Sequence, residues 1–141
     1  MSLTFHMLHE DDIPQINEII EWWTECDHDQ IRNFLSEKQN IAITAKLDEK
    51  IIGLIYGYSL TRIDGNKPQF FIYSVDIHDT YQDKGYGSKF VQYVINWARE
   101  NDFSECFVLT NKDNPRACKV YEKAGLKHSK SDCERMYEVG F

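Results

Sequence analysis

The stretch Gln82-Asp83-Lys84-Gly85-Tyr86-Gly87 decides how this sequence of 141 residues is interpreted. It follows Gln69 to Ile77, a nearly continuous apolar run that predicts a central strand covered on both faces. It precedes a segment from about Gly85 to Arg99 with the apolar spacing of an amphipathic helix. The first N–H groups of such a helix lack intrahelical acceptors and carry the positive end of its dipole. The stretch therefore predicts an anion site suited to a pyrophosphate.

The two glycines of this turn fit that chemistry. Gly85 and Gly87 let the backbone approach a ligand closely and adopt φ values that other residues resist. Lys84 and Lys89 add local positive charge, although the chain carries a formal net charge of −7. The spacing matches neither the dinucleotide-binding fingerprint nor the P-loop. The alternative is that both glycines only form a tight connection between strand and helix, and the turn alone does not separate the two interpretations.

A second segment, Asn114 to Leu126, supplies the missing context. Asn114 and Pro115 predict the start of a helix, and Gly125 predicts its left-handed end. The two segments together resemble the GNAT superfamily of acetyl-CoA-dependent N-acetyltransferases. That superfamily pairs a [Q/R]xxGx[G/A] turn with a later Asn-x-x-Ala-x-x-x-Tyr-x-x-x-Gly-Leu/Phe helix, and both patterns are present here.

The resemblance implies an α/β (α+β) GNAT fold spanning residues 1–141 as one domain. We expect a mixed, mostly antiparallel sheet of six to seven strands flanked by four helices. The local patterns predict strands at residues 4–9, 40–47, 50–60, 69–77 and 105–110, with one or two closing strands in 127–140. They predict helices from Asp11 or Asp12 to Trp23, and at residues 29–37, 85–99 and 114–124.

Acetyl-CoA is the cofactor that the resemblance implies. Backbone amides from Gln82 to Gly87 are expected to bind its pyrophosphate. Main-chain groups of Val75 and Ile77 are expected to pair with the pantetheine arm where their strand splays from the next one. Asn114 is expected to contact the pantetheine or to cap its own helix. The predicted cofactor-binding residues are Val75, Ile77, Gln82, Asp83, Lys84, Gly85, Tyr86, Gly87, Ser88, Asn114, Ala117 and Tyr121.

Two residues are predicted to be catalytic. Tyr121 matches the general acid of the family, and a phenol of pKa near 10 can protonate a departing thiolate of pKa near 8.5. Asp76 is the candidate general base, with a water relay as the alternative. Phe71 and Ser74 stand where related enzymes carry a carboxylate.

The expected acceptor is a primary amine on a small cationic molecule, such as an aminoglycoside or a polyamine. From Ile31 to Val91 the chain most resembles the aminoglycoside 3-N-acetyltransferases. A protein lysine or N-terminus is an alternative acceptor, and a non-catalytic acyl-CoA sensor is an alternative function. The segments expected to line the acceptor pocket carry six acidic residues and a tryptophan pair: Glu18, Glu21, Glu25, Asp27, Asp29, Asp64 and Trp22-Trp23. The alternative is that the acidic residues are solvated on helix surfaces and that at least one tryptophan belongs to the core.

Composition limits the remaining partners. The acidic balance argues against nonspecific nucleic-acid binding. No stretch has the roughly 20 apolar residues of a membrane helix, and the N-terminus lacks signal-peptide features, so a cytoplasmic location is expected. The scattered cysteines, Cys26, Cys106, Cys118 and Cys133, are expected to be reduced thiols without a metal site. The resemblance also makes a homodimer plausible.

Overall fold

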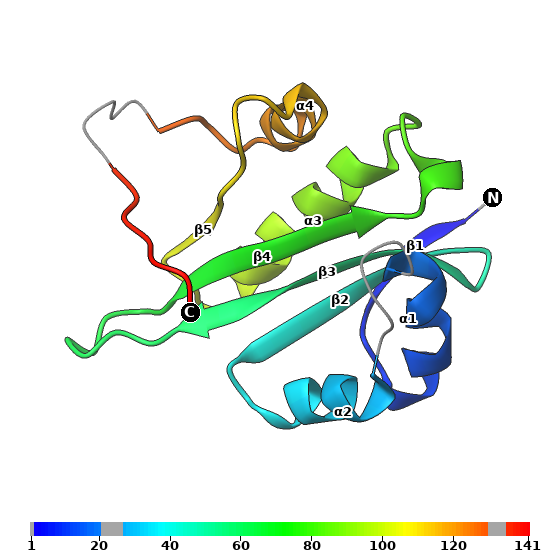
Figure 1. Ribbon diagram of the computed structural model, residues 1–141, viewed down its shortest axis with the longest axis horizontal. Helices are drawn as coiled ribbons and strands as arrows, with labels where there is room; N and C mark the ends of the chain where they lie inside the picture. The colour runs from blue at the N-terminus through cyan, green and yellow to red at the C-terminus, as the bar shows by residue number, and fades with distance from the viewer. Residues whose placement is uncertain (1, 21–26, 130–134) are drawn as a thin grey trace.

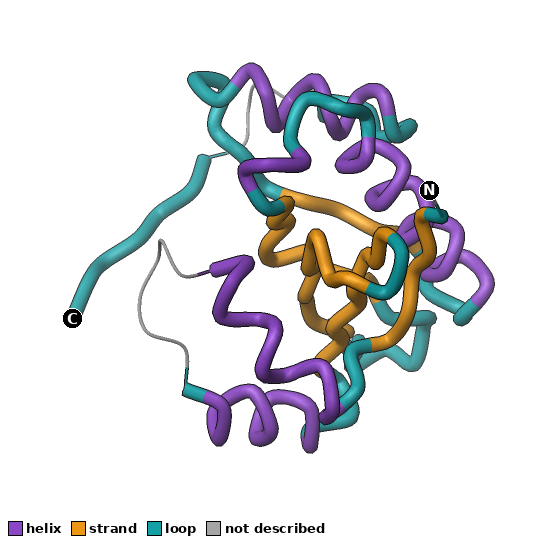
Figure 2. Tube along the Cα trace, turned by 90° about the vertical axis from the view of Figure 1, so that its right-hand side faces the viewer, coloured by secondary structure: helices purple, strands orange, loops and turns teal. Residues whose placement is uncertain are grey.

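The computed structural model describes residues 2–20, 27–129 and 135–141. Within these ranges one sheet of five strands has the spatial order β1-β2-β3-β4-β5, and helices cover both of its faces (Figures 1 and 2). The strands are β1 (Leu3–Met7), β2 (Asn40–Leu47), β3 (Lys50–Leu60), β4 (Gln69–Ile77) and β5 (Glu105–Val108). The helices are α1 (Ile13–Ile20), α2 (His28–Ser36), α3 (Tyr86–Glu100) and α4 (Pro115–Lys123), with short 3-10 helices η1 (Glu10–Asp12) and η2 (Asp79–Tyr81).

The sheet is antiparallel from β1 to β4, and β5 joins β4 in parallel. The predicted mixed, mostly antiparallel sheet is therefore confirmed. The prediction that Gln69–Ile77 is an interior strand of the sheet is confirmed, because β4 lies between β3 and β5. β5 pairs with β4 only from Gln69 to Ile72, which leaves one edge of β4 unpaired from Tyr73 to Ile77 in the described part of the chain.

Two apolar clusters hold the helices onto the sheet. On one face α3 packs against β2, β3 and β4 through side chains that include Ile55, Phe70, Ile72, Phe90 and Val94. On the other face α1 and α2 cover a smaller cluster that includes Ile16, Ile19, Ala42, Ile51 and Leu54. Burial of this apolar surface is the main favourable term in folding. Both faces of β3 and β4 are thereby fixed in place.

A β-bulge changes the direction of side chains on β4. Tyr56 lies opposite Ser74 and Gly57 lies opposite Ile72, so Tyr73 has no partner on β3. A bulge of this kind inserts one residue and re-aims the side chains beside it. The hydroxyl of Ser74 then donates to the Asp76 carboxylate at 2.8 Å, which places these two side chains on the same face.

The predicted number of six to seven strands has to be corrected, because the described residues form five strands. Residues 127–129 and 135–141 contain no strand, and residues 130–134 lie outside the described ranges. A strand needs a neighbour for its N–H and C=O groups. In 135–141 the large apolar side chains are exposed: Met136, Tyr137, Val139 and Phe141. Figure 2 shows this C-terminal segment extending away from the layers.

The start of the first helix also differs from the prediction. The side chain of His9, rather than Asp11 or Asp12, caps η1, and α1 follows at Ile13. Pro14 lies in the first turn of α1, as predicted. Trp22 and Trp23 lie outside the described ranges. None of the described helices is long and apolar enough to cross a membrane.

Gly57→Ala tests the close contact at the bulge. An added Cβ would lie 2.0 Å from the Phe71 carbonyl oxygen and 3.1 Å from the Ile72 Cα, so β3 and β4 would have to separate. We expect the free energy of unfolding to fall by about 2–3 kcal/mol, as in other overpacked sites. Urea denaturation measures it. Gly140→Ala, which meets no atom within 4 Å, is the control and should leave stability unchanged. Equal stability of the two variants would contradict the contact.

Candidate active site

A cavity of about 640 Å³ lies where the second half of β4, the turn before α3 and the start of α4 meet. Most of the predicted cofactor-binding residues line it: Val75, Ile77, Gln82, Asp83, Gly85, Gly87, Ser88, Asn114, Ala117 and Tyr121. Lys84 and Tyr86 are not among the lining residues. Lys84 is exposed, and Tyr86 packs against the larger apolar cluster beside Tyr81.

The N-terminus of α3 faces this cavity without a cap. Gly85 is the N-cap residue, with a φ of 83°, and no side chain accepts a hydrogen bond from the first turn. Within the described residues, the N–H groups of Tyr86, Gly87 and Ser88 have no hydrogen-bond acceptor. By contrast, Asp27 caps α2 and Asn114 caps α4. The three free donors and the helix dipole together favour an anion at this point.

Gln82 ties the turn to its surroundings through its side chain. Its Nε2 donates to the Ile77 carbonyl at 2.9 Å and to Asp79 Oδ1 at 3.2 Å. Its Oε1 accepts from Arg116 at 2.6 Å. The end of β4, the turn and α4 are therefore held together by one amide. The sequence pattern identified Gln82 only through its backbone, and this cross-linking role was not predicted.

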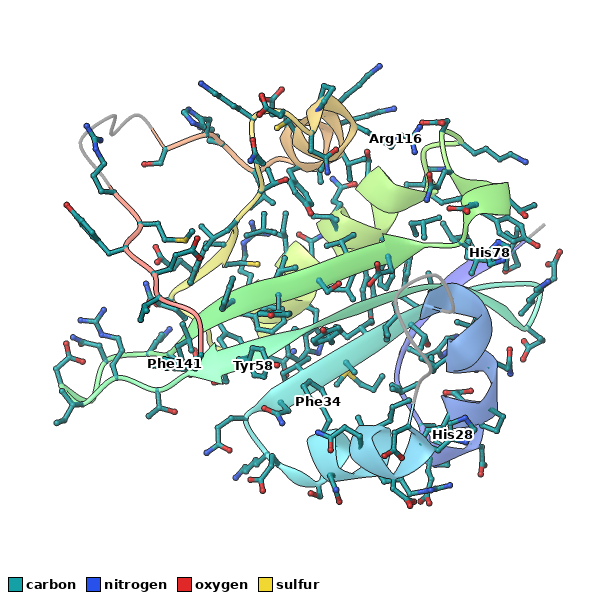
Figure 3. The ribbon with its side chains drawn as sticks, in the orientation of Figure 1. His28, Phe34, Tyr58, His78, Arg116 and Phe141 are labelled. Atoms are coloured by element: carbon teal, nitrogen blue, oxygen red, sulfur yellow. The ribbon has the colours of Figure 1, made fainter. Side chains whose placement is uncertain are left out.

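A row of basic side chains on α4 also lines the cavity. Arg116, Lys119 and Lys123 follow the spacing of one helix face, and Arg116 reaches Asp83 at 3.5 Å as well as Gln82 (Figure 3). These residues were missed in the sequence, although their spacing was visible. They place positive charge beside the α3 N-terminus in an otherwise acidic chain. Phosphate groups are the anions that such a combination suits.

Strand β4 contributes its unpaired edge to the same cavity. Pairing with β5 ends at Ile72 opposite Val108, and Val75 and Ile77 beyond that point are lining residues. The splaying predicted for these two strands is therefore present. Free backbone groups on a strand edge can pair with an extended molecule as a further strand would. The Ile77 carbonyl is already an acceptor for Gln82, so the Val75 backbone is the freer of the two.

The two predicted catalytic residues are Tyr121, which lines the cavity, and Asp76, whose charge acts on Tyr121. Burial raises the pKa of the Tyr121 phenol, and the Asp76 and Cys118 charges raise it further. Burial also raises the pKa of Asp76 to about 6, although the hydrogen bond from Ser74 opposes the rise. Asp76 is 6% exposed and is not one of the lining residues. It acts electrostatically on Tyr121 from the neighbouring face of β4.

The acidic residues expected around an acceptor pocket have other partners. Asp27 caps α2, Asp29 pairs with Arg32, and Asp64 pairs with Arg62 in the loop after β3. Glu21 and Glu25 lie outside the described ranges, as do the two tryptophans of that segment. The side chain of Glu18 is likewise not described, and Asp27, Asp29 and Asp64 do not line the cavity.

Neither of the two described thiols lines the cavity. Cys106 and Cys118 are free, and burial raises the pKa of the Cys106 thiol to about 12. Cys26 and Cys133 lie outside the described ranges. Among described side chains, no group of three or more His, Cys, Asp or Glu residues has a metal-binding arrangement.

A mixed sheet whose parallel strands part beside an uncapped helix defines an N-acetyltransferase of the GNAT fold. Residues 5–126 match the family model described as the Acetyltransferase (GNAT) family, and the chain belongs to this family. Its members use acetyl-CoA as the acetyl donor. A search of curated proteins found no match.

Solved structures confirm the fold. An aminoglycoside acetyltransferase from an uncultured soil metagenomic sample, in complex with sisomicin, has a TM-score of 0.82 at 21% identity, covering 98% of this chain and 97% of that one. A ribosomal-protein-alanine N-acetyltransferase from Brucella melitensis biovar Abortus 2308 has a TM-score of 0.80 at 16% identity over 100% of both chains. A transcriptional regulator from Bacillus halodurans C-125 has a TM-score of 0.80 at 19% identity, covering 99% and 100%.

Gly85→Ala tests the anion site at the α3 N-terminus. Alanine resists a φ of 83°, so the first turn of α3 should shift and its free N–H groups should lose their alignment. We expect the dissociation constant for acetyl-CoA, measured by calorimetry, to rise about tenfold, or about 1.4 kcal/mol.

Gly65→Ala is the matched control for this variant. Gly65 has a φ of 77° and, like Gly85, meets no atom within 4 Å of an added Cβ, but it lies in the remote loop after β3. Both variants carry the same backbone strain, so only Gly85→Ala should weaken binding. The same affinity in both variants would remove the α3 N-terminus from the site.

Proposed function

We propose that this chain binds acetyl-CoA in the cavity and transfers the acetyl group to a primary amine on a small cationic acceptor, with Tyr121 as general acid and Asp76 as general base. The observation that carries this proposal is one cavity that joins an uncapped helix N-terminus to a protonated phenol. The Asp76 carboxylate lies within electrostatic reach of that phenol.

The lining residues fit the donor along its length. The N–H groups of Tyr86, Gly87 and Ser88 would hold the diphosphate. Arg116, Lys119 and Lys123 would neutralise the remaining phosphate charge. The free edge of β4 at Val75 would pair with the amide groups of the pantetheine arm.

When bound, acetyl-CoA supplies an acetyl thioester that an uncharged amine can attack. The attacking species is the uncharged amine, which has already released its ammonium proton, of pKa near 10, to solvent. Asp76 accepts the second proton, the one that the nitrogen loses as the carbon–nitrogen bond forms. Its raised pKa makes it a stronger base than an ordinary aspartate, while it stays ionised at neutral pH. The hydrogen bond from Ser74 orients the carboxylate.

Tyr121 donates a proton to the sulfur as the carbon–sulfur bond breaks. Burial and the nearby Asp76 charge hold its pKa above the ordinary value, so the phenol keeps its proton throughout the neutral range. The overall change is balanced, with one proton moving from the amine to Asp76 and one from Tyr121 to the thiolate. Exchange with solvent then restores both side chains.

Tyr121→Phe removes the proposed acid and keeps the ring. We expect turnover to fall roughly 10²-fold or more, while the dissociation constant for acetyl-CoA stays the same, because the loss is confined to the transition state. Thiol release measures turnover, and calorimetry measures binding. Tyr93→Phe removes a phenol at the β1 edge of the sheet, where Tyr93 stacks on Phe5, and is the control. Wild-type turnover in Tyr121→Phe would exclude this role.

Asp76→Asn tests the base through the pH dependence of the rate. The wild-type kcat/KM should rise through about pH 6 as Asp76 ionises, and the variant should lose both this rise and most of its activity. Asp12→Asn is the control. Asp12 is a buried carboxylate whose Oδ1 lies 3.0 Å from Lys46 Nζ, and it does not line the cavity. A rise near pH 6 that survives in Asp76→Asn would show that another group titrates.

Asp76→Asn, which should lower activity, should raise the stability of the folded chain. Because burial raises the pKa of Asp76 in the folded chain, the native state loses stability as the pH rises from about 4 to about 6. Asp76→Asn removes that loss and should raise the free energy of unfolding at pH 7 by about 2–3 kcal/mol. Lower stability of Asp76→Asn at pH 7 would contradict the buried, unpaired carboxylate.

A further inference from the structure

Six aromatic rings form a continuous row across the sheet on the side of α1 and α2. The row starts at Phe34 on α2, crosses β3 and β4, and ends at Phe107 on β5. Neighbouring ring centroids lie between 4.9 and 5.9 Å apart. We call this set the aromatic row, and its members are Phe34, Tyr56, Tyr58, Tyr73, Phe71 and Phe107.

Tyr73 is the centre of the aromatic row. It contacts Tyr56 and Tyr58 at 5.6 Å and Phe71 at 5.9 Å. It is also the bulged residue of β4, and it is 58% exposed, so its ring is presented to the surroundings instead of being buried in the core. Figure 3 shows Phe34 and Tyr58 on the same side of the sheet, between β3 and α2. The aromatic row is therefore a surface of ring faces and edges with an accessible centre.

The aromatic row leads to the proposed base. Tyr56 lies opposite Ser74, and Ser74 donates to Asp76. The Asp76 charge acts on Tyr56 at one side and on Tyr121 at the other. An amine that reaches Asp76 from the aromatic row thus arrives at the residues proposed to exchange protons with it.

The distribution of charge favours a single ammonium group. A polycation needs several carboxylates in one place; among the described residues, Asp64 is paired with Arg62, while Glu105 accepts from the Gln69 amide and Asp27 from the α2 amides. Within the described part of the chain, the Asp76 charge acts on Tyr56 of the aromatic row. Aromatic faces and edges instead attract another ring, and they also attract a cation through the ring quadrupole.

We infer that the acceptor is a primary amine joined by a short arm to an aromatic ring, with the ring packed on the aromatic row at Tyr73 and the amine at Asp76. This inference rests on the proposed function. The transfer forms the bond between the amine nitrogen and the acetyl carbon and breaks the carbon–sulfur bond. The amine proton passes to Asp76, and the thiolate takes the Tyr121 proton.

The decisive experiment compares kcat/KM for 2-phenylethylamine and ethylamine, with acetyl-CoA as donor and thiol release as the signal. Both molecules present a primary alkylamine, and only one carries a ring. We expect 2-phenylethylamine to be preferred about tenfold or more, because ring packing on an aromatic surface is added to its apolar burial. Spermidine and an aminoglycoside, tested at the same concentrations, should both be poorer than 2-phenylethylamine.

Variants of Tyr73 test whether the preference for 2-phenylethylamine over ethylamine depends on the aromatic row. Tyr73→Ala should reduce the preference for 2-phenylethylamine about tenfold, and Tyr73→Phe should retain it, since the ring remains. Tyr93→Ala removes a surface tyrosine on α3 and should leave all rates unchanged. Circular dichroism and acetyl-CoA calorimetry on each variant show that it is folded and binds the donor.

Three results would overturn the inference: equal kcat/KM for the two amines, a better rate with spermidine or the aminoglycoside, or a preference that survives Tyr73→Ala. Turnover of any amine would leave the proposed function standing in these cases. Absence of turnover with all four amines would also overturn the inference, and calorimetry with acetyl-CoA would then decide whether the proposed function falls with it.

Discussion

The pairing of β4 is the constraint on which the rest of the site depends. β3 follows β4 along its length, whereas β5 leaves it after Ile72. The open edge beyond Ile72 faces α4 and the uncapped start of α3, and a cavity of about 640 Å³ results. On the adjoining face, the bulge at Tyr73 turns Ser74 and Asp76 toward the aromatic row. One half-strand therefore separates a region suited to the donor from a region suited to the acceptor.

Electrostatics divide these two regions in the same way. Helix N–H groups and the basic side chains of α4 gather on the donor side, although the chain as a whole is acidic. On the side proposed for the acceptor, the buried Asp76 carboxylate lies near Tyr56 of the aromatic row. Such a carboxylate costs stability in the folded state, because desolvation disfavours its charged form. Groups that carry out proton transfer commonly have this property, and it is the physical reason to assign Asp76 a role in the reaction.

Local sequence signals predicted much of this architecture. The bounds of β2, β3 and β4 follow from side-chain patterning, and the α4 helix follows from Asn114, Pro115 and Gly125 at its ends. The pairing of the glycine turn with that helix also predicted most of the cavity lining. Features that depend on contacts distant in the chain were not predictable. Gln82 cross-links three elements, the bulge at Tyr73 depends on the register with β3, and the described residues of 127–140 form no strand.

The central claim is that the free N–H groups at the start of α3 hold the diphosphate of acetyl-CoA. Titration of the isotopically labelled protein with acetyl-CoA, followed by amide chemical shifts in NMR, tests it directly. The account predicts large shifts for the amides of Tyr86, Gly87 and Ser88. It predicts none for Asp29 and Gln30, whose amides at the start of α2 are already bound to Asp27. Saturation with acetyl-CoA that leaves the three α3 amides unmoved would contradict the account.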